Sequence, residues 1–146
     1  WGTTLAILLH RKGFSVTLWG AFPDYVSYMN KKRRNERFLP HVLIPKEIEI
    51  THDLKGTING KQLIIFAIPS LYLRKVLKKI KRFYFYDIIF LSVIKGIEVG
   101  SLKRVSQVIH DELGNIKLAV LSGPTIAHEV VRGIPTVAVI ASRDKN

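Results

Sequence analysis

Short runs of apolar, largely β-branched residues recur along this 146-residue chain and are separated by more polar stretches. Most of the runs are apolar almost throughout and lack the alternation of a half-exposed strand. Continuous apolar runs of this length are typical of strands buried on both faces, as in a parallel sheet covered by helices. We therefore expect strands at Ser15–Trp19, Leu63–Ile68, Ile88–Ile94, Leu118–Leu121 and Thr136–Ala141.

Amphipathic stretches of helical length alternate with these runs. Strand–helix–strand alternation indicates an α/β, doubly wound fold with a mostly parallel sheet, in which the crossovers are right-handed. The expected helices cover Thr3–Lys12, Asp24–Arg34, Leu71–Lys81 and Leu102–Leu113.

The segment from residue 22 to residue 60 is less regular than the rest of the chain. It contains three prolines and the polar turn Asn59-Gly60, and we expect a loop across Phe38–Pro40. The chain shows no internal repeat, low-complexity tract or flexible linker. We therefore expect residues 1–146 to form one domain without an internal boundary.

The chain is strongly basic, with 23 Lys and Arg against 11 Asp and Glu and a net charge of +12. A positive field of this size attracts anions, which could be nucleic acid or phosphorylated metabolites and cofactors. No nucleic-acid-binding motif or array of stacking aromatics accompanies the charge, so nucleic acid is the less favoured partner. The basic residues concentrate in two clusters: Lys31, Lys32, Arg33, Arg34 and Arg37, and Arg74, Lys75, Lys78, Lys79, Lys81 and Arg82.

The second basic cluster has apolar residues at helical spacing between its cations, namely Leu73, Val76, Leu77 and Ile80. The cations therefore fall largely on the opposite side of one helix, and the simplest interpretation is a solvated helix face.

Composition excludes several classes of protein. There is no cysteine, so neither a disulfide framework nor thiolate chemistry is expected, which is compatible with a reducing cytoplasm. No apolar run reaches the about 18 residues that span a bilayer, and no secretory leader is recognisable. The five histidines lack ligand spacing, so we expect no metal site.

Lys95 is the first candidate for chemistry, because it follows the apolar run IIFLSVI and precedes a glycine. In a doubly wound fold the ligand lies beyond the carboxyl ends of the strands, where such an ammonium group could bind a phosphate or polarise a carbonyl. The alternative is a lysine whose stem lies on apolar surface and whose charge reaches solvent. Gly96 allows a close backbone approach, and Glu98 could pair with a neighbouring base.

The second candidate is the stretch LSGPTIAHE, from Leu121 to Glu129. Gly123 and Pro124 turn the chain after a strand, and a helix is expected to begin near Thr125. Free N–H groups at a helix start, together with the threonine hydroxyl, could bind an anion. The alternative is that the threonine serves only as an N-cap.

Six motifs in the chain resemble, in order and spacing, those of NAD(P)-dependent glycerol-3-phosphate dehydrogenases. They are WGTTLA, RRNERFLP, THDL, IPSLYLR, SVIKGIE and LSGPTIAHEVVRGIPTVAVIAS, and they extend from Trp1 to about Ser142. The resemblance implies a Rossmann-like cofactor domain that binds NAD or NADP. It also implies hydride transfer between NAD(P)H and dihydroxyacetone phosphate, which gives sn-glycerol 3-phosphate. For the full-length protein it implies a cytoplasmic enzyme, in bacteria one that feeds phospholipid synthesis, and a possible homodimer.

The same resemblance assigns roles to individual residues. Lys95 matches a lysine beside nicotinamide and substrate, and its implied role is to hold the carbonyl oxygen and oppose developing negative charge. Gly123 and Thr125 match residues that contact the substrate. The remaining matches contact the cofactor: Trp1 at its phosphates, Tyr72 as an aromatic against it, and Ala127 through its backbone.

Cofactor preference stays open, because the chain departs from the family near Ala21. An acidic residue at the end of the strand expected at Ser15–Trp19 favours NAD, and a basic residue there favours NADP. Many bacterial members carry Arg or His near this position, whereas this chain has Gly-Ala-Phe-Pro-Asp. Arg33 or Lys32 could substitute for the missing base, or Asp24 could hold a ribose hydroxyl.

The resemblance also indicates which parts of the family's proteins would precede and follow this sequence. In the family a strand and a glycine-rich loop precede the residues that match Trp1–Thr4, and Gly2 matches the last glycine of that loop. An all-helical domain that carries the proton-transferring lysine follows. On this basis we interpret the sequence as the interior of a cofactor domain, incomplete at both ends.

We expect residues 1–146 on their own to be inactive, because the pyrophosphate loop would be missing and two apolar strand edges would be exposed. The measurement is NADH or NADPH oxidation by this polypeptide with dihydroxyacetone phosphate, and clear turnover would contradict the expectation.

A second interpretation is a basic binding module without catalysis, either a degenerate fragment or a nucleic-acid binder. Stop codons at both borders of the coding DNA, or salt-sensitive retention on DNA, would favour it. An in-frame glycine loop upstream and a helical half downstream would favour the dehydrogenase. A third interpretation, a 6-phosphogluconate or hydroxyacyl-CoA type of dehydrogenase, conflicts with the pair SVIKGIE and LSGPTIAHE.

Overall fold

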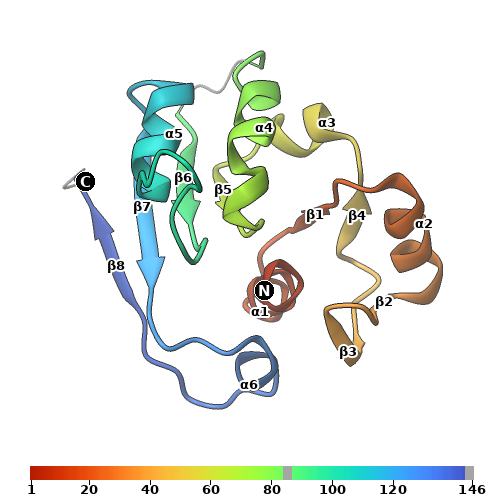
Figure 1. The fold of residues 1–146 in the computed structure, drawn as a ribbon. Coiled ribbons are helices and arrows are strands. Elements are labelled where there is room, and N and C mark those ends of the chain that lie inside the picture. Colours follow the sequence, from red (N-terminus) through yellow and green to blue (C-terminus); the bar gives the residue numbers. More distant parts are fainter. Residues whose placement is uncertain (84–86, 144–146) are drawn as a thin grey trace. The chain divides into compact units, whose positions relative to one another are not determined.

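The computed structural model describes residues 1–83 and 87–143 and has the expected alternation of strands and helices (Figure 1). The chain divides into two compact units. The first unit comprises Trp1–Thr57 and Pro124–Val137. The second unit comprises Ile58–Gly123 and the segment that begins at Ala138.

The first unit contains three helices around two small sheets. The helices are α1 (Gly2–Arg11), α2 (Pro23–Lys32) and α6 (Ala127–Val131), and α3 (Leu54–Ile58) begins at its border with the second unit. The strands are β1 (Thr17–Trp19) and β4 (Glu49–Thr51), which pair in parallel, and β2 (Arg34–Asn35) and β3 (Leu39–Leu43), which pair antiparallel.

One hydrophobic core holds this first unit together. Helix α1 contributes Ala6 and Ile7, and α2 contributes Val26 and Met29, each pair on one face as helical spacing requires. A residue with positive φ follows each helix: Gly13 lies two residues beyond the last residue of α1, and Arg33 comes directly after α2. The other buried residues of this core are Leu39, Ile44, Ile48, Ile50 and Val131.

The structure corrects the expectation of a loop across Phe38–Pro40. Leu39 is buried and begins β3, and β4 was not expected at all. The strands in this region are two to five residues long, which is too short for a clear period. Among the described residues β3 pairs with β2 alone, so it is an edge strand, where a proline is tolerated.

The second unit is a four-stranded sheet with two helices. Its strands are β5 (Leu63–Phe66), β6 (Ile89–Ser92), β7 (Lys117–Ser122) and β8 (Val139–Ser142), in the order β5-β6-β7-β8. The first three pair in parallel, which confirms the α/β class and the mostly parallel sheet. Helices α4 (Ser70–Ile80) and α5 (Val105–Leu113) follow β5 and β6 and pack against each other (Figure 1).

Strand β8 differs from the expected buried parallel strand. It pairs antiparallel with β7 at the edge of the sheet, and all four of its residues are exposed. An apolar run predicts extended structure but carries no information on strand direction.

Helix α4 confirms the prediction of an amphipathic helix with a solvated basic face. Leu73, Leu77 and Ile80 are buried, and the four neighbouring lysines are all exposed. Helix α5, however, begins three residues later than expected, because Leu102 has a positive φ of 56° and lies in a turn closed by the bridge between Ile97 and Arg104.

Within the part of the chain that is described, no helix combines the length and the apolar character that crossing a membrane requires.

Candidate functional site

Three parallel strands of the second unit end at one edge of its sheet. Phe66 of β5 lies opposite Ser92 of β6, which lies opposite Val120 of β7. The segments that leave these strands therefore meet at the same edge, where a doubly wound sheet places its ligands. They carry the candidate residues Tyr72, Lys95 and Gly123.

Lys95 and Gly123 lie next to each other at this edge. The Nζ atom of Lys95 donates a hydrogen bond of 3.4 Å to the carbonyl oxygen of Gly123. Strand β6 ends at Ser92, so Lys95 stands in the loop three residues beyond the strand rather than at its last position, and it is exposed. The ammonium group therefore stands at the carboxyl edge with its charge accessible to an anionic or carbonyl ligand.

The backbone after Lys95 requires glycine. Gly96 has a φ of +104°, which side chains rarely permit, and a Cβ at this position would lie 3.6 Å from Oγ of Ser70. The loop after β6 thus passes close to the start of α4. Tyr72 lies in the first turn of α4 and is exposed.

Glu98, three residues beyond Lys95, is held by Arg74 of α4. Two hydrogen bonds join them, from Nε to Oε1 at 2.7 Å and from Nη2 to Oε2 at 2.8 Å. This pairing confirms the expectation of a base next to Glu98. The same guanidinium also donates to Oε1 of Glu112 at 2.7 Å and to Oδ2 of Asp111 at 3.3 Å, both on α5.

This network shifts the acidities of its members. The hydrogen bonds from Arg74, followed by the one from Ser101, lower the pKa of Glu98 to about 2. The pKa of Asp111 is lowered chiefly by its hydrogen bond from Lys103. Because the folded pKa of Glu98 lies below the unfolded value of about 4.3, its stabilising contribution is complete above that value and is lost as the pH falls through about 2.

In the first unit, Thr125 does not begin a helix. Helix α6 begins at Ala127 with Ile126 as its N-cap, so the expected helix start at Thr125 is wrong by two residues. Thr125 is instead a buried polar residue. The local sequence suggested a cap because Pro and Thr are common at helix starts, but the chain stays extended through Ile126.

Helix α6 is fixed to α1 by two hydrogen bonds. Oγ1 of Thr4 donates to the carbonyl of Ala127 at 3.2 Å, and Nη1 of Arg11 donates to the carbonyl of Val131 at 2.7 Å. Thr4 is fully buried, so the position of Ala127 is set from the first turn of α1.

The amino end of α1 has properties that suit a dinucleotide phosphate. No side chain caps this end, and its first turn contains no acidic residue. The indole Nε1 of Trp1 is buried there and has no hydrogen-bond partner among residues 1–83 and 87–143. Unsatisfied N–H groups at the start of a ten-residue helix attract an anion.

A buried polar network below this end was not anticipated. Nδ2 of Asn35 donates to Oγ1 of Thr3, and the hydroxyl of Tyr25 donates to Oδ1 of Asn35, both at 2.8 Å. Asn35 stands in the motif RRNERFLP, and an asparagine between charged residues gives no sign that it will be buried.

Arg33 is not available to read a ribose phosphate. Its Nη2 donates to the carbonyl of Ile48 at 2.6 Å and also to the carbonyl of Pro45, and its Nε donates to the carbonyl of Ile44. The guanidinium therefore closes the turn before β4. Ala21, which follows β1, is exposed.

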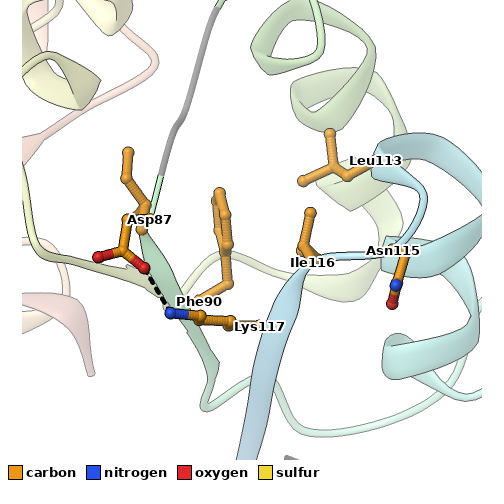
Figure 2. A pocket seen from close by; sticks show the side chains of 7 residues that line it. Asp87, Phe90, Leu113, Asn115, Ile116 and Lys117 are labelled. Carbon is orange, nitrogen blue, oxygen red and sulfur yellow. Dashed lines mark hydrogen bonds and ion pairs between the residues drawn. The ribbon is translucent and has the colours of Figure 1, made fainter.

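A pocket of about 430 Å³ lies at the opposite edge of the sheet in the second unit, near the first residues of β6 and β7 (Figure 2). Asp87 and Lys117 form an ion pair at its rim. Its other lining residues are mainly apolar, and it lies away from the carboxyl edge that carries Lys95. The described residues contain no group of three or more His, Asp or Glu side chains that could hold a metal ion.

Alternating strands and helices, with candidate ligand residues at the carboxyl edge of parallel strands, are typical of the α/β nucleotide-binding class. A family model described as the N-terminus of NAD-dependent glycerol-3-phosphate dehydrogenase matches residues 1–146. The chain therefore belongs to this family and corresponds to its N-terminal part, as the motifs indicated.

Individual relatives agree with this assignment. A glycerol-3-phosphate dehydrogenase [NAD(P)+] of Syntrophomonas wolfei is 41% identical over 99% of this chain, which covers 43% of that protein. The crystal structure of glycerol-3-phosphate dehydrogenase from Coxiella burnetii is 34% identical, with a TM-score of 0.92 over 99% of this chain and 44% of its own. A Plasmodium falciparum glycerol-3-phosphate dehydrogenase has 30% identity and a TM-score of 0.84, and the chain covers 43% of it. The chain thus spans less than half the length of these relatives.

Proposed function

We propose that the complete product of the gene encoding this sequence transfers a hydride between NADH or NADPH and dihydroxyacetone phosphate, giving sn-glycerol 3-phosphate. Residues 1–146 would form its NAD(P)-binding domain. Membership of the family supports the proposal, and the observation that carries it is the contact between Lys95 and Gly123 at the carboxyl edge of the parallel strands.

In this proposal the bound nicotinamide cofactor supplies the hydride. The Lys95 ammonium donates a hydrogen bond to the substrate carbonyl oxygen and stabilises the negative charge that develops there. Gly123 and Thr125 contact the substrate. The exposed position of Lys95 and its fixed neighbour support the role, because a charged donor needs access to the ligand and a defined place.

The residues of the first unit would hold the cofactor. The amino end of α1 and the unpartnered indole of Trp1 fit the pyrophosphate, and the backbone of Ala127 lies against α1 through Thr4. Tyr72, which is exposed in the first turn of α4, is proposed as an aromatic against the cofactor on the family resemblance alone. We further propose a cytoplasmic location, a homodimeric gene product and supply of phospholipid synthesis, all on the family resemblance.

The experiment is to express the complete gene product and follow oxidation of NADH and NADPH with dihydroxyacetone phosphate, identifying sn-glycerol 3-phosphate as the product. Unphosphorylated dihydroxyacetone is the control and should be turned over poorly. Absence of turnover with both cofactors would contradict the proposal, and salt-sensitive DNA binding in an inactive protein would favour the basic binding module.

Cofactor preference gives a separate prediction. Ala21→Arg adds a guanidinium two residues beyond β1, where the adenosine ribose of the cofactor would bind in this proposal. Arg33 does not supply this charge, because its guanidinium already donates to backbone carbonyls. A charge-assisted hydrogen bond contributes roughly 1.5–3 kcal/mol, so we expect kcat/KM for NADPH relative to NADH to rise about tenfold or more.

The matched control for this change is Ala21→Gln, which adds a polar side chain without charge. Steady-state kinetics with both cofactors measure the ratio. An unchanged ratio in the arginine variant, or an equal rise in the glutamine variant, would contradict the placement of the ribose at Ala21.

A further inference from the structure

Arg74 differs from the other cations of its helix. The sequence groups it with the lysines of a solvated face, but its side chain is only 30% exposed and is surrounded by the carboxylates of Glu98, Asp111 and Glu112. Lys75, next in sequence, is exposed. A guanidinium that holds three carboxylates is placed by its fork geometry, which a lysine cannot reproduce.

The network has two arms with different targets. Glu112 and Asp111 belong to α5, so this arm joins two packed helices. Glu98 belongs to no helix or strand and lies in the loop after β6. The second arm therefore joins α4 to the loop that carries Lys95.

Glu98 is the anchor of that loop. Its backbone N–H donates to the carbonyl of Lys103 at 2.9 Å, and its carbonyl accepts from Leu102 at 3.0 Å. The hydroxyl of Ser101 donates to its carboxylate at 2.6 Å. The turn from residue 98 to residue 103 is thus organised around Glu98, and Arg74 ties the whole turn to α4.

On the other side of Lys95, Val93 donates its backbone N–H to the carbonyl of Phe66 at 3.1 Å. Lys95 therefore lies between two fixed points, the sheet at Val93 and the Arg74 contact at Glu98. The intervening Gly96 has the backbone freedom that would let this segment move if the second point were released.

We infer that Arg74 is a positioning residue for Lys95, because its two hydrogen bonds to Glu98 fix the loop that presents the ammonium group to the substrate. The inference rests on the proposed function and names a residue that acts through the loop rather than on the reacting atoms.

The test compares the two arms of the network in the complete gene product. Glu98→Gln weakens the arm to the loop, and Glu112→Gln weakens the arm to α5 by the same chemical change. Because a misplacement of about 1 Å can cost about 100-fold in rate, we expect Glu98→Gln to lower kcat at least tenfold with the affinity for NADH unchanged. We expect Glu112→Gln to retain kcat within about twofold, although its melting temperature falls.

Arg74→Lys gives an independent route, because it keeps the charge and loses the two-pronged contact. We expect Arg74→Lys to lower kcat as Glu98→Gln does. The double variant, Arg74→Lys with Glu98→Gln, should have a kcat no lower than that of either single variant, because each of the three proteins has lost the same contact. The inference is wrong if the unaltered enzyme is active and Glu98→Gln retains its kcat. It is also wrong if Glu98→Gln and Glu112→Gln each lose kcat only in proportion to their loss of stability. If the unaltered gene product does not reduce dihydroxyacetone phosphate, the proposed function itself has failed.

Discussion

Lys95→Met in the complete gene product should lower kcat about 100- to 1,000-fold, the usual loss when one preorganised donor to a developing oxyanion is removed. The affinity for NADH should change little, since the proposed partner of the ammonium group is the substrate oxygen. Methionine keeps the length and apolar stem of lysine, and Lys95 is exposed, so the fold should tolerate the change. Stopped-flow and steady-state kinetics separate the rate of the chemical step from cofactor binding.

The matched control is Lys75→Met, which removes the same charge from an exposed position on α4 away from the sheet edge. It should leave kcat within about twofold. Equal losses in the two variants would mean that overall charge, which is +12 in this chain, governs the rate. A Lys95→Met enzyme with unchanged kcat would contradict the proposed role of Lys95 in stabilising charge on the substrate oxygen.

Phe90→Ala should lower the free energy of unfolding of the second unit by about 3–5 kcal/mol, as for other buried Phe-to-Ala changes. Phe90 is 0% exposed on β6, a strand with a neighbour on either side, and its ring stacks on Phe66 with centroids 5.7 Å apart. Its removal leaves a cavity that the flanking strands cannot close.

Amide hydrogen exchange of the β5–β7 segments in the complete gene product measures this loss, because it reports the opening of the sheet itself. Ile89→Ala is the control on the same strand, at a position that is 47% exposed, and should cost less than about 1.5 kcal/mol. Comparable costs at the two positions would contradict the assignment of Phe90 to the core.

The sequence predicted the second unit well because its elements are regular. The amphipathic spacing around Leu73, Leu77 and Ile80 is confirmed in α4, and three apolar runs form the parallel strands β5, β6 and β7. The direction and exposure of β8 could not be predicted, since the pairing of an edge strand depends on the path of the chain before it. Strand β3 was missed because five residues that include Pro40 resemble a loop.

The candidate site was predicted in part from the residue types. A lysine after an apolar run and a Gly-Pro turn after another are visible in sequence, and the parallel register places Lys95 beside Gly123. The ion-pair network of Arg74 could not be predicted, because its partners lie 24 to 38 residues away in the loop after β6 and on α5, and they meet only in the folded unit. The buried state of Thr125 and Asn35 likewise depends on tertiary packing, which a local pattern does not contain.

The most direct measurement is a crystal structure of the complete gene product with oxidised cofactor and dihydroxyacetone phosphate bound together. We predict that Nζ of Lys95 lies about 3 Å from the carbonyl oxygen of the substrate, with Gly123 and Thr125 in contact with the same molecule. A substrate bound with Lys95 facing solvent, or seated at the opposite edge of the sheet beside Asp87 and Lys117, would contradict the account.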